Sequence, residues 1–277
     1  MPSETVPEIK RTNLSNTVLY LKTLGLRDVL GFDFLDPPSL DQLSEALVEQ
    51  HMLGALDNDG YVTSVGRGMS RFPVEPSVAR MLVAAAESGE ADVVEDVVAI
   101  AAMLSVEKIW VERPLSGVKR DRDHDATSHM VKMIESTQSS LKDERGDHFT
   151  LLKIFRMWIS SGRTKDWCET HFIKFRALKN AQNIYNQLLP DALACTTKPS
   201  TNKSLSLRSR GELVRSAILH GLFMNAARRC SPESLVYRCC DIAIPGASDG
   251  VRLMHLHPDS SLVVAHDADH VVYQVVS

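Results

Sequence analysis

The chain has 277 residues, and 44% of them are hydrophobic, enough apolar material for one large or two to three small packed domains. Lysine and arginine total 31 against 35 acids, a net charge of −4, so RNA binding would require a local basic surface. The sequence shows no signal peptide, no apolar run long enough to cross a bilayer, and no cysteine spacing typical of disulfide frameworks or zinc fingers. We therefore expect a soluble protein of the nucleus or cytoplasm, without a membrane partner.

The first 75 residues predict two helices followed by a hairpin. Apolar residues at helical spacing follow Asn13, and Gly25 is a stop signal. Ser39 and Gln42 have the spacing of a capping box that opens a second helix. The Asp-Gly step in residues 57–60 favours a tight turn. Two helices and a hairpin are typical of a winged-helix domain.

From Pro76 to about Leu193, apolar stripes at helical spacing predict a helical bundle. Residues 119–145 are polar and mixed in charge, so we expect a surface excursion there. The longest helix is predicted from Trp167 to about Leu189.

The C-terminal quarter changes in composition. Residues 195–210 are rich in serine, threonine, lysine and asparagine, which indicates a linker, and residues 211–229 predict a helix. Glycine, proline and aspartate then separate four runs with β propensity, namely residues 235–243, 251–256, 262–265 and 271–276. These runs predict an all-β tail, a small barrel or half-barrel.

Several blocks along the chain resemble, in the same order, the region after the second motor domain of DEAH-box RNA helicases. They include Pro7-Glu8-Ile9-Lys10-Arg11-Thr12-Asn13-Leu14, Phe32-Asp33-Phe34-Leu35-Asp36-Pro37-Pro38, Arg71-Phe72-Pro73-Val74-Glu75-Pro76, Gly146-Asp147-His148, Trp167-Cys168, and Leu256-His257-Pro258-Asp259-Ser260-Ser261. The resemblance implies a mainly α fold with a small β part. Its expected parts are a winged helix (1–75), a helical ratchet domain (76–193), a linker (194–210) and an OB-fold barrel (211–277) that we expect to be truncated.

The motor motifs of that family are not found in the 277 residues. There is no Gly-x-x-x-x-Gly-Lys-Ser/Thr loop, no Asp-Glu-Ala-His tetrad and no arginine-finger motif, and only six residues precede Pro7. We therefore expect no catalytic residue, no metal ligand and no cofactor in this chain, and no ATP hydrolysis by it alone. ATP and Mg²⁺ would serve the full-length family member. A truncated gene model, a split gene and a true short form would each account for this.

The best candidates for RNA contact form a basic run in the last third of the chain. They are Lys203, Arg208, Arg210, Arg215, Arg228 and Arg229. Such side chains neutralise phosphates and release counterions. In the family, the OB-fold and ratchet domains hold single-stranded RNA against the motor. The alternative is an ordinary solvated basic face.

Three apolar residues of the predicted winged helix, Leu53, Leu56 and Val62, are candidates for partner contact, because G-patch proteins brace against that domain in the family. Core packing is the alternative role. The resemblance implies an accessory region that holds RNA and couples it to helicase motor domains in ribonucleoprotein remodelling, such as pre-mRNA splicing, with the nucleus favoured. One alternative is a stand-alone scaffold for G-patch partners or for spliceosomal or ribosome-biogenesis particles, and another is an unrelated hydrolase.

Overall fold

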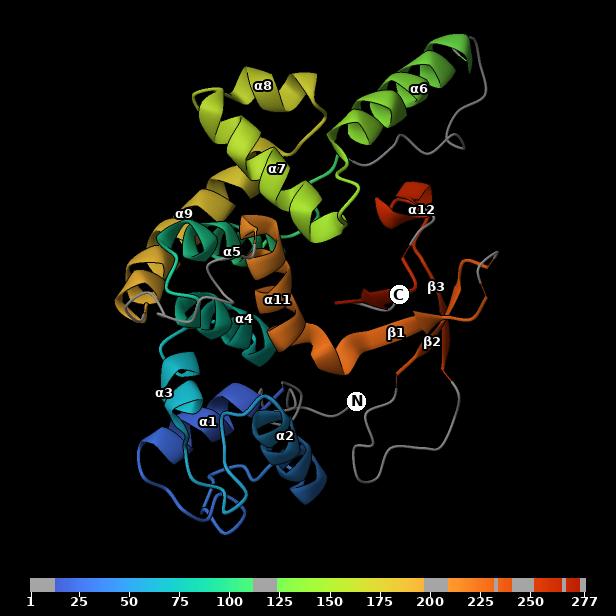
Figure 1. Cartoon of the computed structure of the whole chain (residues 1–277). Helices are drawn as coiled ribbons and strands as arrows, with labels where there is room; N and C mark the ends of the chain where they lie inside the picture. The colour runs from blue at the N-terminus through green and yellow to red at the C-terminus, as the bar shows by residue number, and fades with distance from the viewer. Residues whose placement is uncertain are drawn as a thin grey trace, which may run out of the picture.

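The computed structural model describes residues 13–111, 124–196, 209–231, 234–240, 252–265 and 268–274. Helices dominate, and a small sheet lies to one side of them (Figure 1). The first part of the chain contains α1 (Ser15–Thr23), α2 (Leu40–Met52) and α3 (Ser64–Met69). Within the described ranges, no helix combines the length and the apolar character needed to cross a membrane.

Two local predictions in this first part are confirmed. The Ser39 hydroxyl accepts a hydrogen bond from the Gln42 amide, and the Gln42 side chain accepts one from the Ser39 amide, each at 3.2 Å. The Asp57 carboxylate accepts hydrogen bonds from the amides of Asp59 and Tyr61, at 3.0 and 2.8 Å. Gly60 has a φ of +77°, which a residue with a side chain rarely adopts. The turn thereby closes a hairpin-like bridge between the flanking residues.

Two of the three candidate partner-contact residues are buried, which agrees with the alternative role of core packing. Leu53 and Leu56 are only 2% and 3% exposed, and Leu53 belongs to the main hydrophobic core. Leu53 follows α2 directly, so its side chain turns inward where the chain leaves the helix. Val62 is half-buried and packs against the same core. Leu56 and Val62 form the bridge that closes the turn.

A helical core follows, built around α5 (Ala91–Leu104). Every residue from Val97 to Met103 is buried, because α4 (Pro76–Glu87), α7 (Asp147–Ser160), α9 (Phe175–Ala194) and α11 (Arg210–Leu222) surround this helix. Although α11 was expected to open the β-rich tail, it packs most extensively against α4. The helical core therefore includes a helix that comes after the predicted linker.

Two helical predictions differ from the structure. The predicted helix from Trp167 to Leu189 is divided into α8 (Lys165–Thr170) and α9, because Phe172 adopts a φ of +53° and Ile173 bridges to Trp110. Within the segment 119–145, which was expected to be a surface excursion, residues 124–141 form the helix α6 (Figure 1). Ile134 and Leu141 lie seven residues, about two turns, apart and therefore face the same side of the helix. They are 3% and 2% exposed, so these two buried side chains anchor an otherwise polar helix.

The tail is a four-stranded antiparallel sheet of order β3-β2-β1-β4, with β1 (Ala226–Arg229), β2 (Val236–Cys239), β3 (Leu253–His255) and β4 (His270–Val272). The helix predicted through Arg229 ends at Leu222, and a 3₁₀ turn leads into β1. The run 262–265, predicted as a strand, is the short helix α12 (Leu262–Ala265). A small hydrophobic cluster takes one buried residue from each of three strands, namely Ala227 of β1, Tyr237 of β2 and Val271 of β4. Of the predicted β runs, residues 241–243, 251 and 275–276 lie outside the described residues.

Candidate nucleic-acid interface

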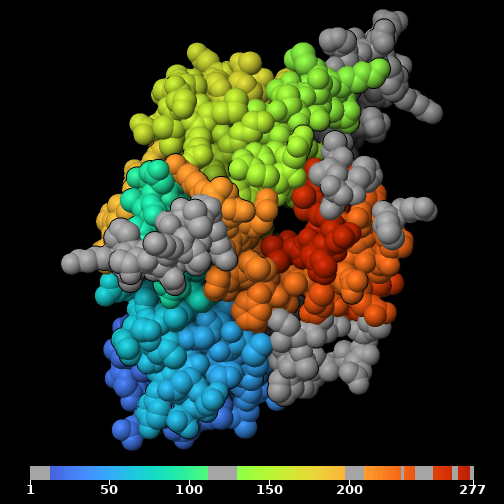
Figure 2. Space-filling view, viewed as in Figure 1, coloured from blue at the N-terminus to red at the C-terminus, as the bar shows by residue number. Residues whose placement is uncertain are grey.

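A cleft of about 1210 Å³ separates the helical core from the sheet. Figure 2 shows it as a hollow between the orange surface of α11, the yellow-green surface of α7 and the red C-terminal segment. Its basic and histidine lining residues come from both sides, namely Arg145, His148, Arg215, His255, His257 and His270. The cleft therefore presents cationic or protonatable groups from segments more than 100 residues apart in sequence.

A carboxylate clasp joins the two walls of the cleft. Asp147, the first residue of α7, accepts hydrogen bonds from the Ser260 hydroxyl at 2.7 Å and from the Ser261 amide and hydroxyl at 2.7 and 2.8 Å. Ser260 and Ser261 are 8% and 3% exposed, so the donors are removed from water. Hydrogen bonds to an ionised acceptor are among the stronger kind. The clasp therefore fixes the segment leading to α12 against the start of α7.

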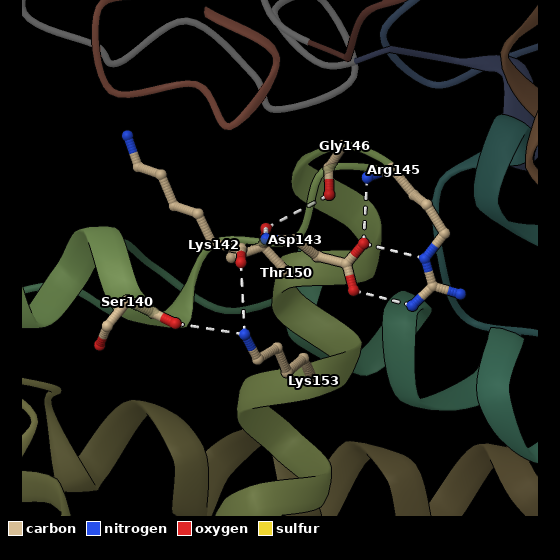
Figure 3. Close-up of polar contacts among 7 residues, drawn as sticks. All are labelled: Ser140, Lys142, Asp143, Arg145, Gly146, Thr150 and Lys153. Carbon is tan, nitrogen blue, oxygen red and sulfur yellow. Dashed lines mark hydrogen bonds and ion pairs between the residues drawn. The ribbon is translucent and has the colours of Figure 1, made fainter. Parts of the chain in front are cut away.

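A second carboxylate, that of Asp143, stabilises the turn between α6 and α7 (Figure 3). The Arg145 guanidinium donates to both oxygens of Asp143, at 2.9 and 2.7 Å, and lies 4.3 Å from the centre of the Phe149 ring. The hydrogen bonds from Arg145 lower the pKa of the Asp143 carboxyl. Lys153 Nζ donates to the carbonyls of Ser140 and Lys142. Arg145 thus lines the cleft while its charge is already matched by an acid.

His148 lies next to the clasp and has an unusual environment. Its Nε2 is buried and has no hydrogen-bond partner among the described residues. Burial lowers the pKa of the His148 imidazole, and the charge of Asp147 opposes this only in part. The neutral imidazole is therefore favoured in the folded protein.

Among the six predicted RNA contacts, two are held in ion pairs. Arg210 donates to both oxygens of Asp96, at 2.6 and 2.8 Å, and Arg229 Nη2 lies 2.6 Å from Asp269. The hydrogen bond from Arg229 lowers the pKa of Asp269. These guanidinium groups already serve structural roles. Lys203 and Arg208 lie outside the described residues.

Arg215 and Arg228 are exposed and form no ion pair within the part of the chain that the structure describes. Arg215 lines the cleft from α11. Arg228 lies on β1 directly opposite Arg238 of β2 on one side and His270 of β4 on the other. Directly opposed residues of antiparallel strands point to the same face, so the three form a row across the sheet, here called the cationic row. All three are exposed.

Sequence reasoning missed Arg238 and His270. Arg238 lies in the predicted run 235–243, and His270 directly precedes the predicted run 271–276. Cross-strand register depends on which strands pair and at what offset. The available signal was the alternation in residues 236–239, where Tyr237 and Cys239 are buried and Arg238 is exposed.

Comparison with known proteins agrees with this architecture. Residues 51–74 match the sequence model of the helicase associated domain (HA2), winged-helix, and residues 75–151 match that of the helicase associated domain (HA2), ratchet-like. The chain is 31% identical over 268 residues to the pre-mRNA-splicing factor ATP-dependent RNA helicase prp22 of Schizosaccharomyces pombe. The match covers 97% of this chain and 20% of that relative, so the chain spans about a fifth of the relative's length.

The two helicase-associated modules follow one another in the order predicted from the sequence blocks, and the similarity to a splicing helicase extends over nearly all of the chain. The family prediction is confirmed. The chain corresponds to the C-terminal, helicase-associated region of DEAH-box RNA helicases.

Proposed function

We propose that this chain holds a single strand of RNA and couples it to a DEAH-type ATPase motor that uses ATP and Mg²⁺. By analogy with prp22, whose name describes a splicing factor and ATP-dependent RNA helicase, the physiological setting would be remodelling of RNA during pre-mRNA splicing in the nucleus. Spliceosomal particles would be its surroundings. In this proposal the 277 residues bind the RNA strand, and ATP hydrolysis by the motor moves the strand.

The cationic row is the observation that carries this proposal. Arg228 and Arg238 occupy directly opposed positions, with His270 next in line on β4. Like charges directly opposite each other on a sheet repel and lower stability. A bridging phosphate removes that repulsion and gains charge-assisted hydrogen bonds from both guanidinium groups. The row therefore has the charge pattern of a surface that contacts a nucleic-acid backbone.

The two edge strands of the sheet give a second argument for the same function. The strands β3 and β4 are the two edges of the sheet, yet residues of both line the same cleft. We propose that the sheet is an incomplete OB-fold barrel, since curling is what brings opposite edges together. OB-folds bind single strands through a basic groove and through stacking, largely without base specificity.

The test compares two double variants in RNA-binding titrations over a range of salt concentrations, using a labelled single-stranded RNA and the whole chain. Arg228→Gln with Arg238→Gln should weaken binding and reduce the salt slope by about 0.7 per lost phosphate contact. Lys132→Gln with Arg163→Gln removes the same charge from exposed positions elsewhere and serves as the control. Undetectable binding at low salt, or equal losses for both double variants, would contradict the proposal.

A second candidate, a scaffold that binds G-patch or ribonucleoprotein partners, is favoured by one observation. The winged-helix part exposes several large apolar residues, among them Tyr20, Leu24, Leu35, Leu40 and Tyr61. Leu35 is fully exposed, at 100%. A binding titration with a G-patch peptide would test this candidate. Leu24→Ser with Leu35→Ser should abolish peptide binding and leave RNA binding unchanged, whereas no binding by the unmodified chain would exclude it.

A further inference from the structure

A second cleft, of about 600 Å³, lies between the segment that follows α5 and the first half of α9. Its charged and amide lining residues are Glu107, Lys108, Lys174, Arg176, Asn180 and Asn183. Three cations thus share the cleft with one acid. Neither the predicted basic run nor the site described above includes any of these residues.

Backbone hydrogen bonds hold the two segments that carry the lysines together. The Lys174 amide donates to the Ile109 carbonyl at 2.7 Å, and the Val111 amide donates to the Phe172 carbonyl at 3.0 Å. Each lysine adjoins a buried isoleucine, because Ile109 follows Lys108 and Ile173 precedes Lys174, and these isoleucines are 4% and 3% exposed. The backbone positions of both lysines are therefore fixed by the core.

The positive charge of this cleft is not neutralised by ion pairs. In the part of the chain that the structure describes, no ion pair involves Lys108, Lys174 or Arg176, and none involves Glu107, the one acid of the lining. Like charges that share a cleft raise each other's electrostatic energy, and an anionic ligand relieves that repulsion. The cleft therefore favours ligands that carry negative charge.

The apolar part of the lining favours a peptide over a nucleic acid. Val106 and Ile184 are half-buried and pack against the main core, and Ala177 is buried beside them in the lining. These side chains form an apolar wall that suits an aliphatic side chain. None of the described lining residues is aromatic, whereas proteins that bind single-stranded nucleic acids stack the bases on aromatic side chains.

The amide side chains of α9 also match a peptide. Arg176, Asn180 and Asn183 are four and three residues apart, so they form a row on one face of the helix. A carboxamide both donates and accepts, as a peptide group does, whereas a phosphate only accepts. The row is about 10 Å long, from seven residues at about 1.5 Å each. That length corresponds to about three residues of extended peptide.

We propose that this cleft, here called the α5–α9 cleft, is a docking site for a short, extended, acidic segment of a partner protein. Lys108, Lys174 and Arg176 pair with carboxylates of the segment, and the carboxamides of Asn180 and Asn183 bind its backbone. The apolar wall receives an aliphatic side chain that lies between the acids. The inference goes beyond the proposed RNA contact and does not depend on it.

The first measurement is a display selection of short random peptides on the full 277-residue chain, with the Lys174→Glu and Arg176→Glu double variant as the counter-selection. Peptides enriched on the unmodified chain alone should combine aspartate or glutamate with an aliphatic residue. Thermal unfolding verifies that the double variant is folded. Enrichment of peptides without acids, equal enrichment on both proteins, or no enrichment at all overturns the proposal.

The second measurement is the affinity of a selected, labelled peptide. Lys174→Gln with Arg176→Gln should weaken binding at least about tenfold, because two charge-assisted contacts are lost. Lys174→Arg with Arg176→Lys keeps both charges and should retain most of the affinity. Lys132→Gln with Arg163→Gln removes the same charge from exposed positions elsewhere and should change nothing. Equal losses in the two glutamine double variants would show a general effect of charge and contradict a site at this cleft.

The amides provide a test that leaves the cations in place. Asn180→Asp with Asn183→Asp puts two acids on an exposed face of α9 and should abolish binding of the acidic peptide. Unchanged binding would show that the peptide does not follow the row on α9, and the proposal would be wrong.

A labelled single-stranded RNA distinguishes the other anionic ligand. The Lys174→Gln and Arg176→Gln double variant should bind this RNA as tightly as the unmodified chain does. Weaker RNA binding by that variant, with the selected peptide still bound, would make the cleft an RNA contact and overturn the proposal. Loss of RNA binding in the Arg228 and Arg238 double variant bears on the proposed function alone, so the two ideas fail separately.

Discussion

Asp96 of α5 and Arg210 of α11 form a two-pronged ion pair across 114 residues of sequence. The Asp96 side chain is only 5% exposed, and it also accepts a hydrogen bond from Arg156 of α7. One carboxylate therefore ties three helices of the core together. The guanidinium of Arg210, a predicted RNA contact, is therefore engaged in holding α11 against α5.

The first prediction concerns the stability of this pair. Arg210→Gln removes one of the two cations that offset a buried charge, and a broken buried pair costs about 3 to 5 kcal/mol. Arg210 is 41% exposed, so solvent screening reduces the expected loss to about 1 to 3 kcal/mol. Urea unfolding measures the change, with Arg163→Gln as an exposed control. An unchanged midpoint together with a reduced salt slope for RNA binding would instead support a direct RNA contact.

The second prediction concerns the crossing of α4 and α11. A Cβ added to Gly221 would lie 2.2 Å from the Ser77 carbonyl oxygen and 2.4 Å from Met81 Cγ. Gly221→Ala should therefore destabilise the fold by about 1 to 3 kcal/mol, the usual cost of overpacking, despite the better helix propensity of alanine.

Gly211, in the first turn of the same helix, offers a matched control. Its added Cβ would be 3.5 Å from Arg145 Nη1, an ordinary contact. Gly211→Ala should be neutral or stabilising by up to about 1 kcal/mol. Equal effects of the two substitutions in chemical denaturation would show that the helices do not cross as closely as described.

The parts of the fold that could be predicted from sequence depend on contacts between near neighbours. The capping box of Ser39 and Gln42 and the turn at Asp57 each close within four residues, so the local sequence determines them. The break before α9 could not be seen in the same way. The apolar spacing continues from Trp167 through His171 to Phe175. The positive φ of Phe172 and the pairing of Ile173 with the distant Trp110 interrupt the helix there.

The sequence predicted that the candidate site would be basic, but it did not predict which residues form it. A basic run indicated where cations are concentrated, but the local sequence does not show which arginines have acidic partners. Asp96 neutralises Arg210 and Asp269 neutralises Arg229, while strand register adds Arg238 and His270 to Arg228. Each of these relationships joins residues that tertiary packing alone brings together.

The third prediction concerns the clasp between the helical core and the sheet. Asp147→Ala removes the acceptor of three hydrogen bonds and leaves the buried donors of Ser260 and Ser261 without their partner. Hydrogen bonds to charged groups contribute about 1.5 to 3 kcal/mol each, and an unsatisfied buried donor adds a cost.

We expect the loss to be local. Amide hydrogen exchange should accelerate in β3 and in the segment before α12, while amides of α5 keep their protection. Salt slopes for RNA binding should stay the same even if affinity falls, because Asp147 contacts no phosphate. Uniform acceleration throughout the chain would show that the clasp supports the whole fold instead.

The fourth prediction is a pH dependence that originates at His148. Burial lowers the pKa of this imidazole below its ordinary value of 6.5, so the unfolded chain binds a proton at His148 more readily than the folded chain does. Stability therefore rises with pH in this range and falls as the pH drops below about 6.5. At pH 5.5, the loss relative to pH 7.5 should reach up to about 1.4 kcal/mol from this residue. The carboxyls of Asp143 and Asp269, whose pKa values are lowered from 3.8, lose their contribution only at more acidic pH.

The measurement is the free energy of unfolding in urea at pH 7.5 and 5.5 for the unmodified chain and for His148→Gln. The glutamine cannot take up a proton, so the variant should lose less stability between the two pH values, and the difference isolates His148 from the other histidines. The sign is decisive. If the unmodified chain gained stability relative to the variant on acidification, the folded state would favour the imidazolium, and the charge of Asp147 would outweigh burial. If the two proteins responded alike, His148 would be as accessible to water in the folded chain as in the unfolded one.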